Sequence, residues 1–186
     1  MQTWEDAELG EFVFNNYSWG RLFDLPGFSR LTYRGFFDPA DGAQNSLVPL
    51  AIVLEDDFRP PGPWAISLAQ RIIADHSRIL DLVLTALLED IKGEGPKSGT
   101  WWNGKIELVR ELIPNASSPG CLTENDLCSA LGFPSIIIKD SANDDKDVTA
   151  TMAFDCIFEP EHGVGILTNG ERVVGIGSAL DVDPFN

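Results

Sequence analysis

Basic residues are scarce in this chain of 186 residues. It has 13 lysines and arginines against 29 aspartates and glutamates, which gives a formal net charge of −16. Nucleic-acid binding needs a cationic surface that displaces counterions, so this balance argues against nucleic acid as a partner and disfavours an anionic membrane. A basic protein would be attracted, although the same negative charge also serves solubility alone.

Long hydrophobic runs are also missing. The best candidate, residues 79–88, is too short to cross a bilayer and contains Asp81. The first twelve residues lack the basic and apolar regions of a secretory signal. Three cysteines are an odd number, which favours reduced thiols over a disulfide framework. Together these features predict a cytoplasmic protein.

Motifs that carry chemistry are absent as well. The sequence has no GxSxG, P-loop, HExxH or dinucleotide-binding fingerprint. Cys121 and Cys128 are seven residues apart, which is poor zinc spacing. Residues 140–147 carry four acids but lack the glycine and the final glutamate of a calcium-binding EF-hand loop. We therefore expect no cofactor, no metal and no catalytic residue.

The hydrophobic pattern predicts one α+β domain over residues 1–186. It divides into an N-terminal meander of strands at about 10–55, a helical layer at about 63–132, and a C-terminal antiparallel unit of three to four strands at about 135–178. We expect a mainly antiparallel sheet, with a long helix and one or two short helices packed on one face. The strand at 47–54 is apolar on both faces.

Residues 64–91 carry apolar side chains at helical spacing and are expected to form the long helix, with a bend or a break at 75–77. Two short helices are expected at 107–113 and 123–131. Because Gly132 ends the second and Pro134 blocks its continuation, the next strand is expected at 135–139.

Residues 149–178 read as three consecutive antiparallel strands. Met152, Phe154, Cys156 and Phe158 alternate along the first of them, so these four side chains should point into the core. Asn169-Gly170 is typical of a two-residue hairpin turn, and this turn would place Ile166 opposite Val173. Gly163 and Gly165 would then leave room for a close neighbour or a bulge.

The run at 154–177, FDCIFEPEHGVGILTNGERVVGIG, resembles a group of uncharacterised bacterial domains. Their C-terminal hairpin reads roughly F-x-C-x-W-D-x-EHG-x-G, then an aliphatic pair, a tight turn and V-x-x-I/V-G. The matching residues here are Phe154, Cys156, Glu161, His162, Gly163, Gly165, Val174 and Gly177. Residues 158–160 depart from the group, which has Trp-Asp and a further acidic residue there.

Such domains are similar to those encoded beside polymorphic toxins, where small acidic proteins serve as immunity proteins. The resemblance and the charge favour a non-enzymatic protein-binding domain that neutralises a basic toxin domain by direct binding. Trp101 and Trp102, adjacent in a glycine-rich loop, are the expected anchors. The acids expected to meet the partner are Asp144, Asp145, Asp147, Glu159 and Glu161.

Two alternatives stay open. A small hydrolase or metal-dependent enzyme could be centred on His162, with Glu161 or Asp155 within hydrogen-bonding reach in a concave pocket. The chain could instead be a structural module of a larger assembly. We favour a structural role for the turn motif, formed by Glu161, His162, Gly163, Gly165, Asn169 and Gly170.

Overall fold

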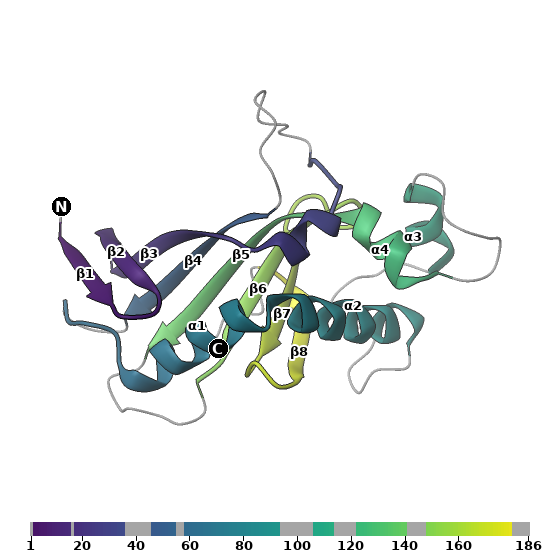
Figure 1. Cartoon of the computed structure of the whole chain (residues 1–186). Coiled ribbons are helices and arrows are strands. Elements are labelled where there is room, and N and C mark those ends of the chain that lie inside the picture. Colours follow the sequence, from purple (N-terminus) through teal and green to yellow (C-terminus); the bar gives the residue numbers. More distant parts are fainter. Residues whose placement is uncertain are drawn as a thin grey trace.

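The computed structural model describes residues 2–15, 17–35, 46–54, 58–93, 106–113, 122–140 and 148–179. Within these ranges eight strands form one continuous sheet, and their order across the sheet is their order along the chain (Figure 1). The strands are β1 Thr3–Asp6, β2 Gly10–Asn15, β3 Ser18–Asp24, β4 Leu47–Leu54, β5 Leu131–Asp140, β6 Ala150–Cys156, β7 Val164–Thr168 and β8 Val173–Ser178.

Every described strand pair is antiparallel except β4–β5, which is parallel. A parallel pair needs a long crossover connection, and the chain between these two strands contains α1 Pro63–Ala74, α2 His76–Lys92, α3 Ile106–Leu112 and α4 Glu124–Ala130. A short 3₁₀ helix, η1 Pro26–Arg30, precedes β4. The architecture is therefore α+β, with a mostly antiparallel sheet and a few helices. None of the helices in the described part has the length and apolar content that a membrane span needs.

The expected long helix is divided. Helix α1 ends at Ala74, Asp75 has non-helical φ and ψ angles of −106° and 19°, and α2 starts at His76. Pro63 occupies the first turn of α1, where a missing N–H costs nothing. Gly93 closes α2 in the left-handed conformation.

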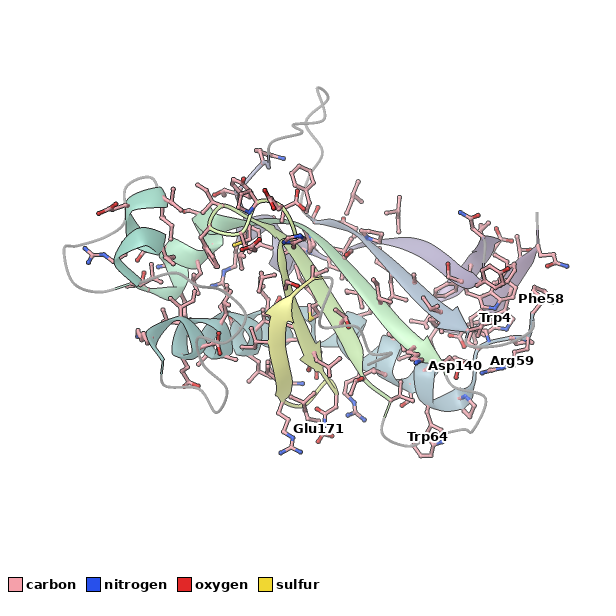
Figure 2. The ribbon with its side chains drawn as sticks, turned by 180° about the vertical axis from the view of Figure 1, so that it is seen from behind. Trp4, Phe58, Arg59, Trp64, Asp140 and Glu171 are labelled. Atoms are coloured by element: carbon pink, nitrogen blue, oxygen red, sulfur yellow. The ribbon has the colours of Figure 1, made fainter. Side chains whose placement is uncertain are left out.

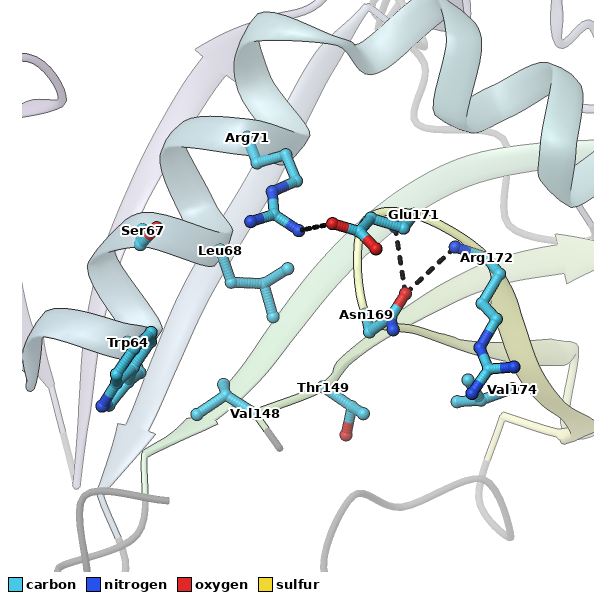
Figure 3. Close-up of a pocket in the computed structure, with 10 residues that line it drawn as sticks. All are labelled: Trp64, Ser67, Leu68, Arg71, Val148, Thr149, Asn169, Glu171, Arg172 and Val174. Atoms are coloured by element: carbon cyan, nitrogen blue, oxygen red, sulfur yellow. Dashed lines mark hydrogen bonds and ion pairs between the residues drawn. The ribbon is translucent and has the colours of Figure 1, made fainter. Parts of the chain in front are cut away.

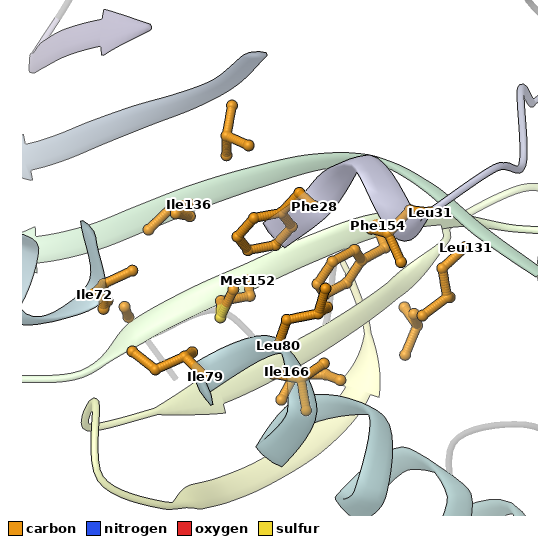
Figure 4. Packing of buried hydrophobic residues seen from close by; sticks show 14 of the residues in the cluster. Phe28, Leu31, Ile72, Ile79, Leu80, Leu131, Ile136, Met152, Phe154 and Ile166 are labelled. Carbon is orange, nitrogen blue, oxygen red and sulfur yellow. The ribbon is translucent and has the colours of Figure 1, made fainter. Parts of the chain in front are cut away.

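The core lies between the sheet and the helices (Figure 4). Burial alternates along β4 and β5, and the register places their buried side chains on one face with those of β6 and β7. Phe28 of η1 stacks on Phe154 of β6 at a centroid distance of 6.5 Å. In Figure 1, α1 and α2 run along the same side of the sheet.

Several strand boundaries differ from the prediction. Strand β5 begins at Leu131, immediately after α4, so Gly132 and Pro134 lie inside it, at a register irregularity between Gly132 and Ser135. A Cβ on Gly132 would lie 1.9 Å from the carbonyl oxygen of Tyr33, so the close passage of residues 31–35 requires this glycine. At the N-terminus the predicted meander began at about residue 10 and so missed β1.

The β7–β8 register also differs. The loop has four residues, 169–172, so Thr168 pairs with Val173, and Ile166 faces Ile176 rather than Val173. The two-residue turn predicted at Asn169-Gly170 was wrong.

Candidate functional site

The turn that carries the family-like motif is held by local contacts. His162 is exposed, and its Nδ1 lies 3.1 Å from a carboxylate oxygen of Glu159. The hypothesis of a His162-centred enzyme required Glu161 or Asp155 as this partner. Gly163 adopts φ +66°, and its N–H donates to the Glu159 carbonyl oxygen at 2.8 Å. A Cβ there would lie 2.4 Å from the Phe154 carbonyl oxygen, so this tight turn admits only glycine.

Cys156 is a packing residue. Its side chain is buried together with Met152, Phe154 and Phe158, which confirms the predicted core face of this strand. Burial raises the pKa of the Cys156 thiol to about 12. A thiol in this state has almost no thiolate at neutral pH and is a poor nucleophile.

Five of the expected partner-binding residues, Trp101, Trp102, Asp144, Asp145 and Asp147, lie outside the described residues. The other two lie in the β6–β7 turn, where Glu159 is half-buried and Glu161 is exposed. Among the described residues no group of three or more His, Cys, Asp or Glu side chains could hold a metal ion.

An apolar area lies on the sheet face that points away from the core. It consists of Val13, Leu22, Leu47, Pro49 and Ala51, which we call the open face. The β2–β4 register puts these side chains on one side, because directly paired residues project to the same face. Leu22 is 63% exposed and Leu47 is 52% exposed. Towards β6 the same side of the sheet is closed, since Thr151 is only 2% exposed.

Acidic side chains border the open face. Glu5 of β1 and Glu11 of β2 are exposed and directly paired, and they project to the same side as Val13. Asp24 pairs with Leu47 at the other end. Like charges placed directly opposite each other destabilise a strand pair. The open face therefore combines solvated leucines with carboxylates that repel one another.

A pocket of about 450 Å³ lies between α1, the β7–β8 turn and the start of β6 (Figure 3). Helix α1 contributes Trp64, Ser67, Leu68 and Arg71, whose spacing places them on one helix face. The facing walls are formed by Val148, Thr149, Asn169, Glu171, Arg172 and Val174.

The turn wall of this pocket is fixed from two directions. Within the turn, the Asn169 side-chain oxygen accepts hydrogen bonds from the backbone N–H groups of Glu171 and Arg172, both at 3.0 Å. From the helices, Arg71 forms an ion pair with Glu171 at 2.9 Å and Arg78 donates to the Gly170 carbonyl oxygen at 3.0 Å. Asn169 and Gly170 thus lie in a four-residue turn that is held both from within and from the helices.

Sequence reasoning missed both the pocket and the open face. The pocket's helical side was visible as Trp64, Ser67, Leu68 and Arg71 at i, i+3, i+4 and i+7, which mixes polar and apolar side chains on one stripe. For the open face, the signal was the strand at 47–54 with apolar residues on both faces, because a strand with one buried face normally alternates with polar residues.

Comparison with known proteins gives a family but no function. No curated protein and no solved structure matches the chain. The family model described as a domain of unknown function, DUF6985, matches residues 67–182, which include β5 to β8, most of α1 and the whole of α2. The chain therefore belongs to the DUF6985 family.

Proposed function

We propose that this chain is a non-enzymatic protein-binding domain that binds a basic partner protein through the open face. The observation that carries the proposal is the exposure of Leu22 and Leu47 at diagonally neighbouring positions of β3 and β4, with carboxylates at both ends. An apolar centre with a polar rim is the usual anatomy of a protein interface. Scattered single exposed leucines need no such explanation, but neighbouring ones on one face of a sheet do.

The charge selects the kind of partner. A net charge of −16 attracts a basic protein over distances comparable to the Debye length. At close range, a lysine or arginine placed between Glu5 and Glu11 would relieve their mutual repulsion. The partner is therefore expected to present an apolar patch rimmed by lysines or arginines.

We further propose that the partner is a bacterial toxin domain and that this chain is a cytoplasmic immunity protein. Support comes from the resemblance of the 154–177 run to domains encoded beside polymorphic toxins, and from the acidic composition. Immunity by covering a toxin needs no chemistry from the chain. Trp101, Trp102, Glu159, Glu161 and the acids at 144–147 remain candidate contacts in addition to the open face.

The experiment is a binding assay with the full chain and the product of the neighbouring upstream gene. We expect binding that weakens between about 50 mM and about 500 mM NaCl, because salt screens exposed charges, and we expect the chain to rescue cells from that product. Leu22→Ser and Leu47→Ser should each weaken binding by about 5- to 30-fold, which corresponds to the loss of about 1–2 kcal/mol of apolar burial.

Leu112→Ser is the matched control, because Leu112 is 48% exposed but lies on α3, away from the open face. Its affinity should equal that of the wild type. The open face would be rejected as the binding surface if all three substitutions weakened binding equally, or if none of them weakened it. Binding without rescue would keep the protein-binding proposal and remove the immunity proposal.

A further inference from the structure

We propose that the pocket between α1 and the β7–β8 turn binds a small carboxylate whose remaining part is apolar, such as an aromatic or branched aliphatic acid. This site is separate from the open face and does not depend on the function proposed above. Its volume of about 450 Å³ falls within the range of small-molecule sites, about 300–1,000 Å³.

Part of the pocket lining is apolar. Trp64 and Leu68 contribute to it from α1 and Val148 and Val174 from the facing walls, and Trp64 remains 40% exposed and Val174 44% exposed. In Figure 3 the Trp64 indole lies at the α1 end of the pocket and the Arg172 guanidinium lies at the opposite end. A ligand with a flat or branched apolar body would remove this indole and the valines from water.

The charges of the lining favour an anion. The lining contains two arginines, Arg71 and Arg172, and one acid, Glu171, so it carries one net positive charge in a chain whose net charge is −16. Arg71 is already paired with Glu171. Among the described residues the Arg172 guanidinium has no hydrogen-bond or ion-pair partner. A guanidinium offers parallel N–H donors that match the two oxygens of a carboxylate.

The negative charge of Glu171 makes the pocket favour a carboxylate ligand over a phosphate. A phosphate carries nearly two negative charges at neutral pH, and the second would meet the Glu171 carboxylate without a free cation to offset it. A carboxylate carries one charge, which Arg172 alone can balance. The hydroxyl groups of Ser67 and Thr149 and the side-chain NH₂ of Asn169 add neutral donors to the same lining.

The pocket is also preorganised. The contacts from Arg71 and Arg78 hold the 169–172 turn against the helices, and the Asn169 side chain is fixed by two backbone N–H groups. A ligand therefore meets a turn whose backbone is already in place and does not have to order a loop, which improves affinity for a given set of contacts.

The test is NMR titration of the full ¹⁵N-labelled chain with phenylacetate, its neutral isostere phenylacetamide, and inorganic phosphate. We expect phenylacetate to bind about tenfold more tightly than phenylacetamide. It should shift the signals of the Trp64 indole N–H and of the backbone amides of Thr149, Asn169 and Arg172. Arg172→Gln should remove the preference for the acid over the amide, whereas Arg21→Gln, on β3, should keep it.

Trp64→Ala should weaken both organic probes, and an otherwise unchanged spectrum would show that the variant folds. The proposal is overturned if phenylacetate shifts no pocket signal up to about 20 mM, a limit well above the dissociation constants of specific ligands. It is equally overturned if the acid and the amide bind alike, if the shifts lie outside the pocket, or if phosphate gives the same shifts as phenylacetate.

Discussion

The carboxylate of Asp140 connects the end of β5 to the start of α1, and its removal tests how much this connection stabilises the fold. One carboxylate oxygen lies 2.7 Å from an Arg59 guanidinium nitrogen and 2.7 Å from the backbone nitrogen of Gly62, the N-cap of α1. The Trp19 indole N–H in turn donates a hydrogen bond of 2.7 Å to the backbone carbonyl oxygen of Arg59. Figure 2 shows Arg59 and Asp140 beside each other at this end of the sheet.

Asp140→Ala should lower the free energy of unfolding by about 2–4 kcal/mol. A hydrogen bond to a charged group contributes about 1.5–3 kcal/mol, and breaking a buried ion pair costs about 3–5 kcal/mol. The Asp140 side chain is 5% exposed but that of Arg59 is 32% exposed. Because the Arg59 guanidinium can regain water, the ion-pair figure is reduced by about half or more.

Urea unfolding followed by tryptophan fluorescence measures this loss. Asp81→Ala is the matched control, since Asp81 also pairs with an arginine, Arg30, but both partners are largely exposed. The control should change stability by no more than about 1 kcal/mol. Asp140→Asn, which keeps one acceptor oxygen, should fall between the two. If Asp140→Ala costs no more than Asp81→Ala, the bridge between β5 and α1 contributes nothing and the reasoning fails.

Two further predictions concern the β7–β8 turn and the core. Gly170→Ala should lower the free energy of unfolding by about 2–3 kcal/mol, because Gly170 has φ +83° and a Cβ would lie 2.9 Å from Arg71 Cδ; Gly93→Ala, at φ +79° with open space around it, should cost only about 1 kcal/mol in the same urea assay. Burial raises the pKa of the Cys156 thiol to about 12, so the folded chain keeps a proton that the unfolded chain releases near pH 8.5. The contribution of this thiol to the free energy of unfolding is therefore fully present below about pH 8.5 and falls by about 1.4 kcal/mol per pH unit above it. Urea unfolding between about pH 8 and about pH 10.5 should show this fall, and Cys156→Ala should flatten it by roughly 2.5 kcal/mol over the range; identical slopes would reject the buried neutral thiol.

The sequence predicted elements well where the signal is local. Alternation from Met152 to Phe158 identified the core face of β6, and Thr123 and Asp126 form a capping box that starts the second short helix. The break between α1 and α2 was also marked locally, by Asp75 and its neighbours. These features depend on residues within one or two turns of each other, so composition and spacing suffice.

Prediction failed where a distant contact decides the local structure. Asn169-Gly170 favours a two-residue turn in an isolated hairpin. Here Thr168 Oγ1 donates to the Arg172 carbonyl oxygen at 2.9 Å, and Arg71 and Arg78 hold the turn from two helices nearly a hundred residues away. Gly132 is similar, because the passing backbone of Tyr33 requires it inside a strand rather than at a helix end.

The two proposed sites lie in different parts of the chain, and this has consequences for the family. The DUF6985 match covers 67–182, which contains every residue of the pocket lining except Trp64. Leu22 and Leu47 of the open face lie outside it, on strands that extend the sheet beyond β5. If the chain has the protein-binding function proposed above, its contact surface on the open face lies outside the residues that the family shares. A carboxylate pocket, in contrast, can be sought in any member that keeps the turn at 169–172 against the α1 helix.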